Sequence, residues 1–134
     1  MPTRPRLLII DDEVDVARTL AMIFQTDGFL VEVAFSGREA IERLARSPKF
    51  DAVITDLSRE TPASAFDVVR AARQLKPKPV IVISTDYATE SNLQMAWNLR
   101  VDHIVIKPSP VDELRNAIRR LLSLRKVAGV SGQS

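Results

Sequence analysis

Five short apolar runs alternate along this chain with five longer stretches whose apolar residues recur at helical spacing. Most of the runs are nearly continuous in Val, Ile and Leu, as are strands buried on both faces of a parallel sheet. Alternation of such strands with helices is typical of βα units. The sequence therefore predicts an α/β fold, a doubly wound five-stranded parallel sheet with helices on both faces. The runs are Leu7 to Ile10, Leu30 to Ala34, Ala52 to Thr55, Val80 to Ile83 and Ile104 to Ile106.

The stretches between the runs carry start and stop signals for helices. Gly28 follows the first apolar stripe and is expected to end that helix, and Ser36 with Glu39 three residues later forms a capping box for the second. Ser109 is the expected N-cap of the last helix, with Pro110 at its first position. The third, fourth and fifth helices are expected over residues 65–75, 88–99 and 110–126.

Length and composition predict one globular domain. The chain has 134 residues, of which 46% are hydrophobic and 27% charged, and this balance is typical of a soluble protein. We expect a domain over residues 1–127 and a tail or linker stub over 128–134. The apolar runs are too short to span a membrane, and no secretory signal is expected at the start. The absence of cysteine excludes disulfides and thiolate metal sites and fits a cytoplasmic location.

Charge gives no indication of nucleic-acid binding. The formal net charge is +2, the basic residues are scattered among acidic ones, and the chain has one Trp and one Tyr. A nucleic-acid interface would show a concentrated basic face with stacking aromatic residues. We therefore expect neither direct nucleic-acid binding nor a membrane partner for this domain.

Polar residues follow four of the five apolar runs. Carboxyl ends of parallel strands lie at one edge of a sheet, where ligands of open α/β sheets bind. The sequence therefore predicts one pocket that holds three carboxylates, a hydroxyl and an ammonium. The residues are Asp11 and Asp12 after the first run, Asp56 after the third, Ser84 after the fourth and Lys107 after the fifth.

Three carboxylates without His or Cys form an oxygen-rich cluster that suits a hard cation such as Mg²⁺. The cation would relieve their mutual repulsion and neutralise the oxygens of a phosphoryl group in transfer. Asp56 then has two possible roles, as a metal ligand only or as a nucleophile that forms an acyl phosphate. Lys107 and Ser84 would supply a cation and a hydrogen-bond donor to the same phosphoryl group. Taken singly, each Asp has the alternative role of a turn or helix-capping residue.

Four segments together resemble the receiver domains of bacterial two-component response regulators. They are LIIDDE at 8–13, ITDL at 54–57, PVIVIS at 79–84 and the pair Lys107-Pro108. The resemblance extends from Leu7 to about Arg125, and the size is similar to that of chemotaxis-type single-domain receivers. It implies a flavodoxin-like strand order 2-1-3-4-5.

The resemblance also implies a role for each pocket residue. Asp56 would accept a phosphoryl group from a histidine kinase or a phosphotransfer protein. Mg²⁺ would be held by Asp12, Asp56 and the backbone carbonyl of Ser58, with Asp11 acting through a water. Ser84 would be the switch hydroxyl and Lys107 the partner of the phosphoryl oxygens.

Three further features follow from the same resemblance. Thr85 matches a small residue that leaves access to the acceptor, and the Lys107-Pro108 bond is cis in similar proteins. A downstream protein would bind the face made by the fourth helix, the fifth strand and the fifth helix. Leu122, Leu124 and Val127 extend the apolar character of the last helix, and a homodimer contact there is possible.

Departures from the family pattern concern the way phosphorylation would be read out more than the pocket itself. Ile104 stands where Tyr or Phe is usual, so coupling through a rotating ring is not available in its usual form. The loop over residues 59–65 is one residue longer than usual. Arg100, Val101 and Ser109 replace the Gly, Ala and aromatic residue common at their positions, and Ser58 and Asp86 match positions that tune phosphoryl loss.

Two other functions remain open. A receiver-like interaction module with weak or atypical phosphorylation would fit Ile104 and the irregular loop. A phosphatase of the haloacid-dehalogenase type would need a second acid two residues after the nucleophile, and that position is Ser58. We expect no turnover enzyme, but a domain that catalyses its own phosphorylation and dephosphorylation.

Overall fold

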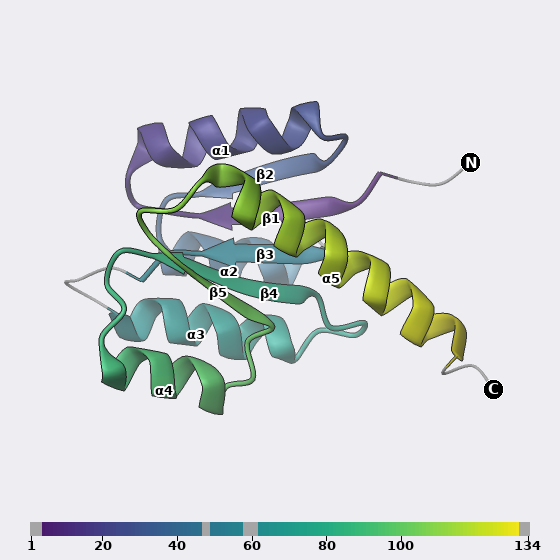
Figure 1. Cartoon of the computed structure of the whole chain (residues 1–134). Coiled ribbons are helices and arrows are strands. Elements are labelled where there is room, and N and C mark those ends of the chain that lie inside the picture. Colours follow the sequence, from purple (N-terminus) through teal and green to yellow (C-terminus); the bar gives the residue numbers. More distant parts are fainter. Residues whose placement is uncertain (1–3, 47–48, 58–61, 132–134) are drawn as a thin grey trace.

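Five parallel strands pair in the order β2-β1-β3-β4-β5 in the computed structural model, which confirms the predicted sheet (Figure 1). The structure describes residues 4–46, 49–57 and 62–131, with side chains for all of these except 62–63 and 127–131. Register pairs Leu7 of the first strand with Val31 on one side and Ala52 on the other. The strands are β1 (Arg6–Ile10), β2 (Leu30–Ala34), β3 (Ala52–Thr55), β4 (Val80–Thr85) and β5 (His103–Ile106).

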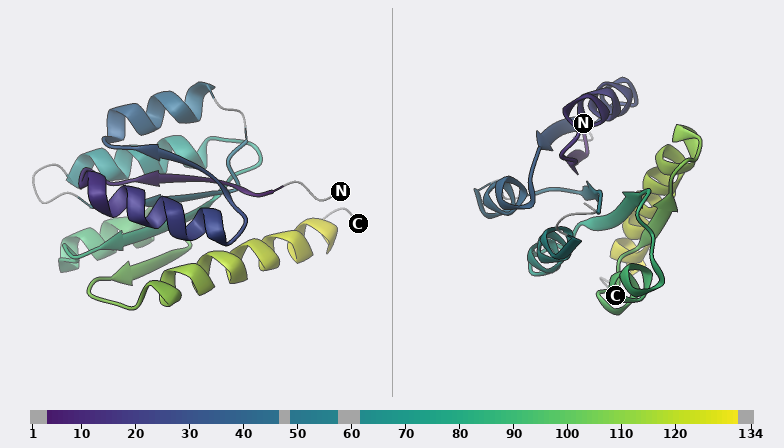
Figure 2. Two further views of the ribbon diagram at one scale, coloured as in Figure 1. Left: turned by 90° about the horizontal axis from the view of Figure 1, so that it is seen from above. Right: turned by 90° about the vertical axis from the view of Figure 1, so that its left-hand side faces the viewer.

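Helices cover both faces of the sheet, as predicted (Figure 2). Residues of one strand point alternately to the two faces: Leu8 packs in the core with α2, α3 and α4, whereas Leu7 packs with α1 and α5. The sheet is therefore buried on both sides, which explains the nearly continuous apolar runs. The helices are α1 (Val14–Thr26), α2 (Gly37–Arg46), α3 (Pro62–Arg73), α4 (Glu90–Asn98) and α5 (Val111–Ser131).

Two helices end in the same hydrogen-bond pattern with different residues. After α1, Gly28 adopts φ +97°, and its N–H donates to the Gln25 carbonyl at 3.0 Å. After α4, Arg100 adopts φ +59°, and its N–H donates to the Trp97 carbonyl at 3.0 Å. The left-handed conformation favours glycine at this position. The departure at Arg100 therefore carries backbone strain that Gly28 avoids.

The ends of α5 differ from the prediction. The helix begins at Val111, one residue later than expected, and continues to Ser131 rather than ending near Lys126. The Arg125 guanidinium donates to the Asp51 carbonyl at 2.7 Å, which anchors the helix to the loop before β3. The helical backbone thus runs through the expected domain boundary at 127, which stays a prediction. In Figure 1 the end of α5 projects beyond the sheet.

Candidate functional site

Three carboxylates meet at the carboxyl edge of the sheet. One oxygen of each of Asp11, Asp12 and Asp56 lies within 4.8 Å of the others. The Asp11 N–H donates to the Ala34 carbonyl and the Asp56 N–H to the Ile10 carbonyl, both at 3.1 Å. The hydrogen-bond ladder therefore continues one residue past the strands. This extension holds the backbone of both acids in the register of the sheet.

Lys107 reaches the same cluster from β5. Its N–H donates to the Thr85 carbonyl at 2.8 Å, and its Nζ lies 3.7 Å from Asp11 Oδ2 and 3.8 Å from Asp56 Oδ2. The Lys107–Pro108 peptide bond is cis, as the resemblance implies. The structure thus brings the predicted acids and the predicted lysine together in one site.

Burial raises the pKa of both inner carboxyls. Desolvation raises the pKa of Asp56 to about 6, although the Lys107 charge, a hydrogen bond from the Thr85 hydroxyl and the Leu57 N–H act against it. Desolvation also raises the pKa of Asp11, which is opposed by a hydrogen bond from the Glu13 N–H. These acids repel one another in a partly dry site, so a bound cation would be favoured there.

The cluster fits Mg²⁺ by its donor chemistry. All three side chains offer carboxylate oxygens, which magnesium prefers, and Asp12 is exposed while Asp11 is buried. Magnesium usually keeps several waters, and the exposed side of the cluster leaves room for them. Asp11, Asp12 and Asp56 are therefore the residues that would hold the ion. The predicted carbonyl ligand at Ser58 lies outside the described residues.

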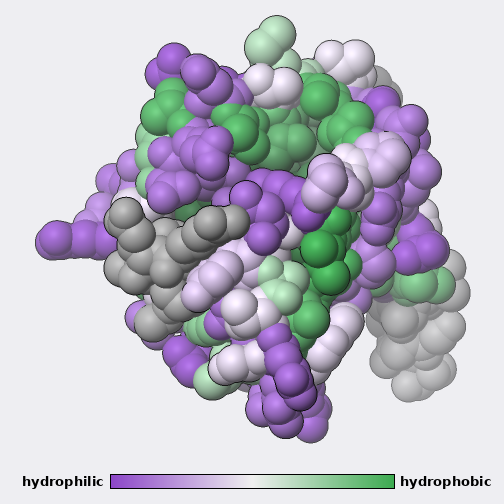
Figure 3. All heavy atoms as spheres, turned by 60° about the vertical axis from the view of Figure 1, so that its left-hand side comes forward, coloured by the Kyte–Doolittle hydropathy of each residue, from purple (hydrophilic) through white to green (hydrophobic). Residues whose placement is uncertain are grey.

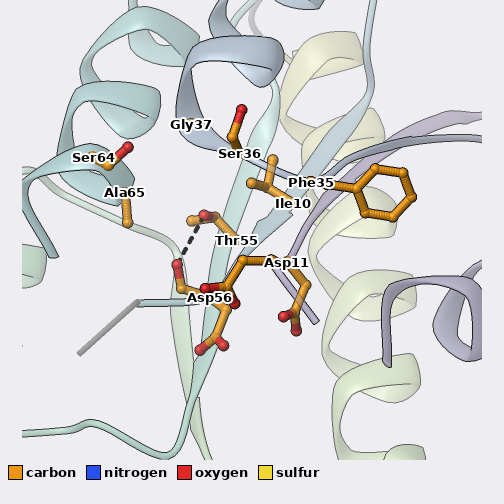
Figure 4. Close-up of a pocket in the computed structure, with 10 residues that line it drawn as sticks. Ile10, Asp11, Phe35, Ser36, Gly37, Thr55, Asp56, Ser64 and Ala65 are labelled. Carbon is orange, nitrogen blue, oxygen red and sulfur yellow. Dashed lines mark hydrogen bonds between the residues drawn. The ribbon is translucent and has the colours of Figure 1, made fainter. Parts of the chain in front are cut away.

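A pocket of about 130 Å³ opens beside the carboxylates. Its far wall is formed by the first residues of α2 and α3, including Gly37 and Ser64 (Figure 4). A Cβ added to Gly37 would clash with the Ser64 hydroxyl and lie 3.0 Å from the Ser64 carbonyl oxygen, so a larger residue here would shift this helix contact. Sequence reasoning missed this wall, because neither residue carries a signal without its neighbour. Seen from the side shown in Figure 3, the surface mixes hydrophilic and hydrophobic residues.

Two hydroxyl residues end β4. Ser84, the expected switch hydroxyl, is buried on β4 opposite Val105, and its role stays a prediction. The Thr85 hydroxyl, which is completely buried, donates to the Leu57 carbonyl at 3.4 Å and acts against the rise in the pKa of Asp56. Thr85 was expected only to be small enough to leave access to the acceptor. The presence of a hydroxyl at that position was the signal that could have identified it.

A family model for the response regulator receiver domain matches residues 7–119 of the chain. A response regulator receiver protein of Anaeromyxobacter sp. strain Fw109-5 is 33% identical over 119 residues, covering 89% of this chain and 46% of that protein. The response regulator ArlR of Staphylococcus haemolyticus is 27% identical, covering 87% of this chain and 52% of that protein. The chain therefore spans about half the length of these curated relatives.

Solved structures share the fold. A CheY-like receiver domain protein of Methanospirillum hungatei superimposes with a TM-score of 0.85 at 22% identity, covering 92% of this chain and 98% of that one. The response regulator TrrA of Thermotoga maritima, solved in complex with Mg²⁺ and BeF, gives 0.74 at 26% identity, covering 87% and 98%. Within the described residues, no helix is both long and apolar enough to cross a membrane.

Proposed function

The chain belongs to the response regulator receiver family of two-component signal transduction, and we propose that it is a phospho-accepting receiver with Asp56 as the acceptor. Receiver domains are signalling proteins that take phosphoryl groups from histidine kinases. They are not enzymes that turn over an external substrate. A phosphohistidine on a kinase or a phosphotransfer protein is therefore the proposed phosphoryl donor.

One observation carries the proposal: Lys107 Nζ lies within 3.8 Å of both Asp11 and Asp56, and the Asp56 oxygens lie beside two further carboxylates. The Leu57 N–H holds Asp56 Oδ1 at 2.8 Å, so Oδ2, on the lysine side, is the oxygen we assign to attack. A bond forms from Oδ2 to phosphorus while the bond from phosphorus to the imidazole nitrogen breaks, and its electron pair stays on that nitrogen. Lys107 then stabilises the phosphoryl oxygens.

The protonation state of Asp56 suits this role. Only the carboxylate attacks, and a pKa of about 6 leaves the group mostly ionised at neutral pH. A bound magnesium ion would neutralise charge on the carboxylates and on the phosphoryl oxygens. The network that holds the aspartate in place is formed by the backbone of the sheet and of Leu57. Loss of the phosphoryl group would follow by attack of water at the same phosphorus.

The test is mass spectrometry after treatment with a small phosphodonor such as acetyl phosphate. We expect a gain of one phosphoryl group in the presence of Mg²⁺ and little gain in the presence of a chelator. The Asp56→Asn variant should show no gain, whereas Asp67→Asn, an exposed carboxylate on α3, should label like the wild type. Undiminished labelling of Asp56→Asn would refute the assignment of the acceptor.

The proposed output surface is the α4-β5-α5 face. It exposes the large apolar side chains of Met95, Trp97 and Ile106, the last two being about half exposed. Aromatic side chains and Met are enriched at protein interfaces. A downstream protein is the proposed partner, and Leu124 on α5, 57% exposed, is the proposed contact for a homodimer. Absence of direct nucleic-acid binding by this domain and a cytoplasmic location stay predictions.

A specific observation favours a second candidate, an interaction module that responds weakly to phosphorylation. Ile104 packs against the core cluster of α2, α3 and α4, and a branched aliphatic side chain cannot exchange hydrogen bonds as a tyrosine can. Affinity for a partner, measured with and without a beryllofluoride mimic of the phosphoryl group, separates the two functions. A large effect of the mimic supports the switching receiver, and no effect supports the module.

A further inference from the structure

The fold separates charges that are scattered along the sequence. In Figure 1 the arrowheads of the strands point to the carboxyl edge of the sheet, and the segments that lead into the strands lie at the opposite, amino edge. Five exposed cations stand in the segments before β1, β3, β4 and β5, and none of them forms an ion pair with another described residue. They are Arg4, Lys49, Lys76, Lys78 and Arg100.

The acids of the amino edge are already bonded within the same chain. Asp51 accepts a hydrogen bond from the Arg6 N–H at 2.7 Å, and Asp102 accepts one from the Ile81 N–H at 2.8 Å. The side chain of Asp27 is only 5% exposed and is paired with arginines of α5. The five cations, which we call the basic edge, are therefore left without an ion-pair partner among the described residues.

The carboxyl edge carries the opposite charge. Its exposed cation Arg38 is paired with Glu42 at 3.8 Å, and Lys107 is directed toward Asp11 and Asp56. Six exposed acids of this edge form no ion pair with a described residue, and we call them the acidic edge. They are Asp12, Glu13, Asp15, Asp86, Glu90 and Glu113.

Helix dipoles explain only part of this separation. Acids are favourable in the first turn of a helix, which accounts for Asp15, Glu90 and Glu113. The cations of the basic edge all lie outside the helices, and the effect of the dipole falls off within the last turn. The basic edge is therefore a surface feature that helix stability does not require.

We propose that the basic edge of one copy binds the acidic edge of a second copy in a head-to-tail association. The two surfaces have complementary charge and belong to the same chain. Such a contact is heterologous and leaves one free edge at each end, so further copies can add. A copy seated on the acidic edge covers the surroundings of Asp56 and slows access of a phosphoryl donor. This last consequence rests on the proposed function, whereas the association itself does not.

The strength of this contact depends on ionic strength, because both edges are exposed to solvent. The screening length falls from about 30 Å at 0.01 M salt to about 10 Å at 0.1 M. The association should therefore be observed at low salt and be lost as salt is added. An apolar dimer contact through Leu124 would persist under the same change, since burial of apolar surface does not depend on charge.

The experiment measures the average mass of the full chain by light scattering at about 0.01 M and about 0.3 M salt. Two double variants each reverse one edge: Lys76→Glu with Lys78→Glu, and Glu90→Lys with Glu113→Lys. The matched control is Arg18→Glu with Arg120→Glu. It changes the net charge as the first variant does, at exposed positions within α1 and α5.

We expect the wild type and the control to exceed the monomer mass of 14.9 kDa at low salt and to return to it at high salt. Each edge variant alone should stay monomeric. An equal mixture of the two should form a one-to-one dimer, because one variant keeps the acidic edge and the other keeps the basic edge. A wild type that is monomeric at low salt would overturn the proposal, as would a mixture that does not associate.

Labelling by acetyl phosphate tests the effect on the acceptor. At low salt the rate for the wild type should fall as the protein concentration rises, whereas the rate for each edge variant should not. Equal rates at all concentrations, in a wild type that associates, would overturn the shielding of Asp56. A wild type that takes no label at any concentration would instead refute the proposed function, while the mass measurements still decide the association.

Discussion

The ammonium of Lys107 lies 3.8 Å from Asp56 Oδ2, although the two residues follow strands that are separated by β4. The distance exceeds that of a hydrogen bond. Lys107 therefore offsets the charge of the Asp56 carboxylate without forming a hydrogen bond to it. Its N–H donors stay available for a further anion. Asp11, at 3.7 Å, shares the same ammonium, so one cation serves two carboxylates.

Replacement of Lys107 by Met should strengthen Mg²⁺ binding. A cation about 4 Å from the carboxylates repels a second cation, and partial screening by solvent reduces that effect to roughly 1 kcal/mol. We expect Mg²⁺ to bind about three- to tenfold more tightly, measured by isothermal titration calorimetry, while phosphorylation slows. The exposed Lys126→Met on α5 is the matched control. Weaker binding of Mg²⁺ by Lys107→Met would contradict the placement of the ammonium.

Asp56→Asn should stabilise the protein at neutral pH when no metal is present. The folded pKa of Asp56 is raised to about 6 from 3.8. The protonated Asp56 side chain therefore makes its full contribution to the free energy of unfolding below about pH 4. This contribution is lost as the pH rises through about 6. Allowing for partial exposure, we expect Asn to raise the free energy of unfolding by about 2 kcal/mol at pH 7. Urea denaturation with EDTA at pH 4 and pH 7 checks this, and an equal gain at both pH values would contradict it.

Asp27→Asn should show the opposite dependence on pH. Hydrogen bonds from Arg115, at 2.6 and 2.8 Å, lower the pKa of this nearly buried carboxyl after α1. Its stabilisation is present above about pH 4 and is lost as the pH falls through the lowered pKa. We expect the variant to lose about 2 kcal/mol at pH 7, and we expect this difference from the wild type to shrink as the pH is lowered below about 4, by urea denaturation. Arg119→Ala, which removes a more exposed partner of Asp27, should lose less.

Arg100→Gly should raise stability. Arg100 has φ +59° where α4 ends, and a left-handed residue with a Cβ costs roughly 1–2 kcal/mol. Part of the gain is offset by the entropy of glycine in the unfolded chain, so we expect about 0.5–1 kcal/mol in thermal or urea unfolding. Arg100→Ala keeps the Cβ and should give no such gain. Gly28→Ala should lower the stability. A Cβ there would meet no other atom, but the backbone stays at φ +97°, which is strained for a residue with a Cβ.

The positions of the site residues could be predicted because each lies directly after an apolar run. A parallel sheet brings the ends of such runs to one edge whatever the loops between them do. The alternation of runs and helices was therefore enough to place Asp11, Asp56 and Lys107 near one another. The resemblance supplied the order of the strands, which the periodicity of the runs does not contain.

Features that depend on a neighbour in space were not predictable in this way. The contact between Gly37 and Ser64 joins two helices, and the bond from Asn92 to the Tyr87 carbonyl depends on how α4 meets its loop. The extent of α5 was also missed, since residues after Lys126 have weak helical signals. The partner of Arg125, Asp51, lies 74 residues earlier in the sequence.

The extra rungs at Asp11, Asp56 and Lys107 have a consequence for redesign of this scaffold. The backbone N–H of each residue donates a hydrogen bond to an adjacent strand. The charged residues are therefore held as rigidly as the sheet, whatever the flexibility of the connecting segments. Those segments can be lengthened, exchanged or grafted from another protein while the acceptor and its counter-charge keep their spacing. Specificity for a donor or a target can in this sense be changed in the connecting segments, while the strand ends keep the chemistry of the acceptor.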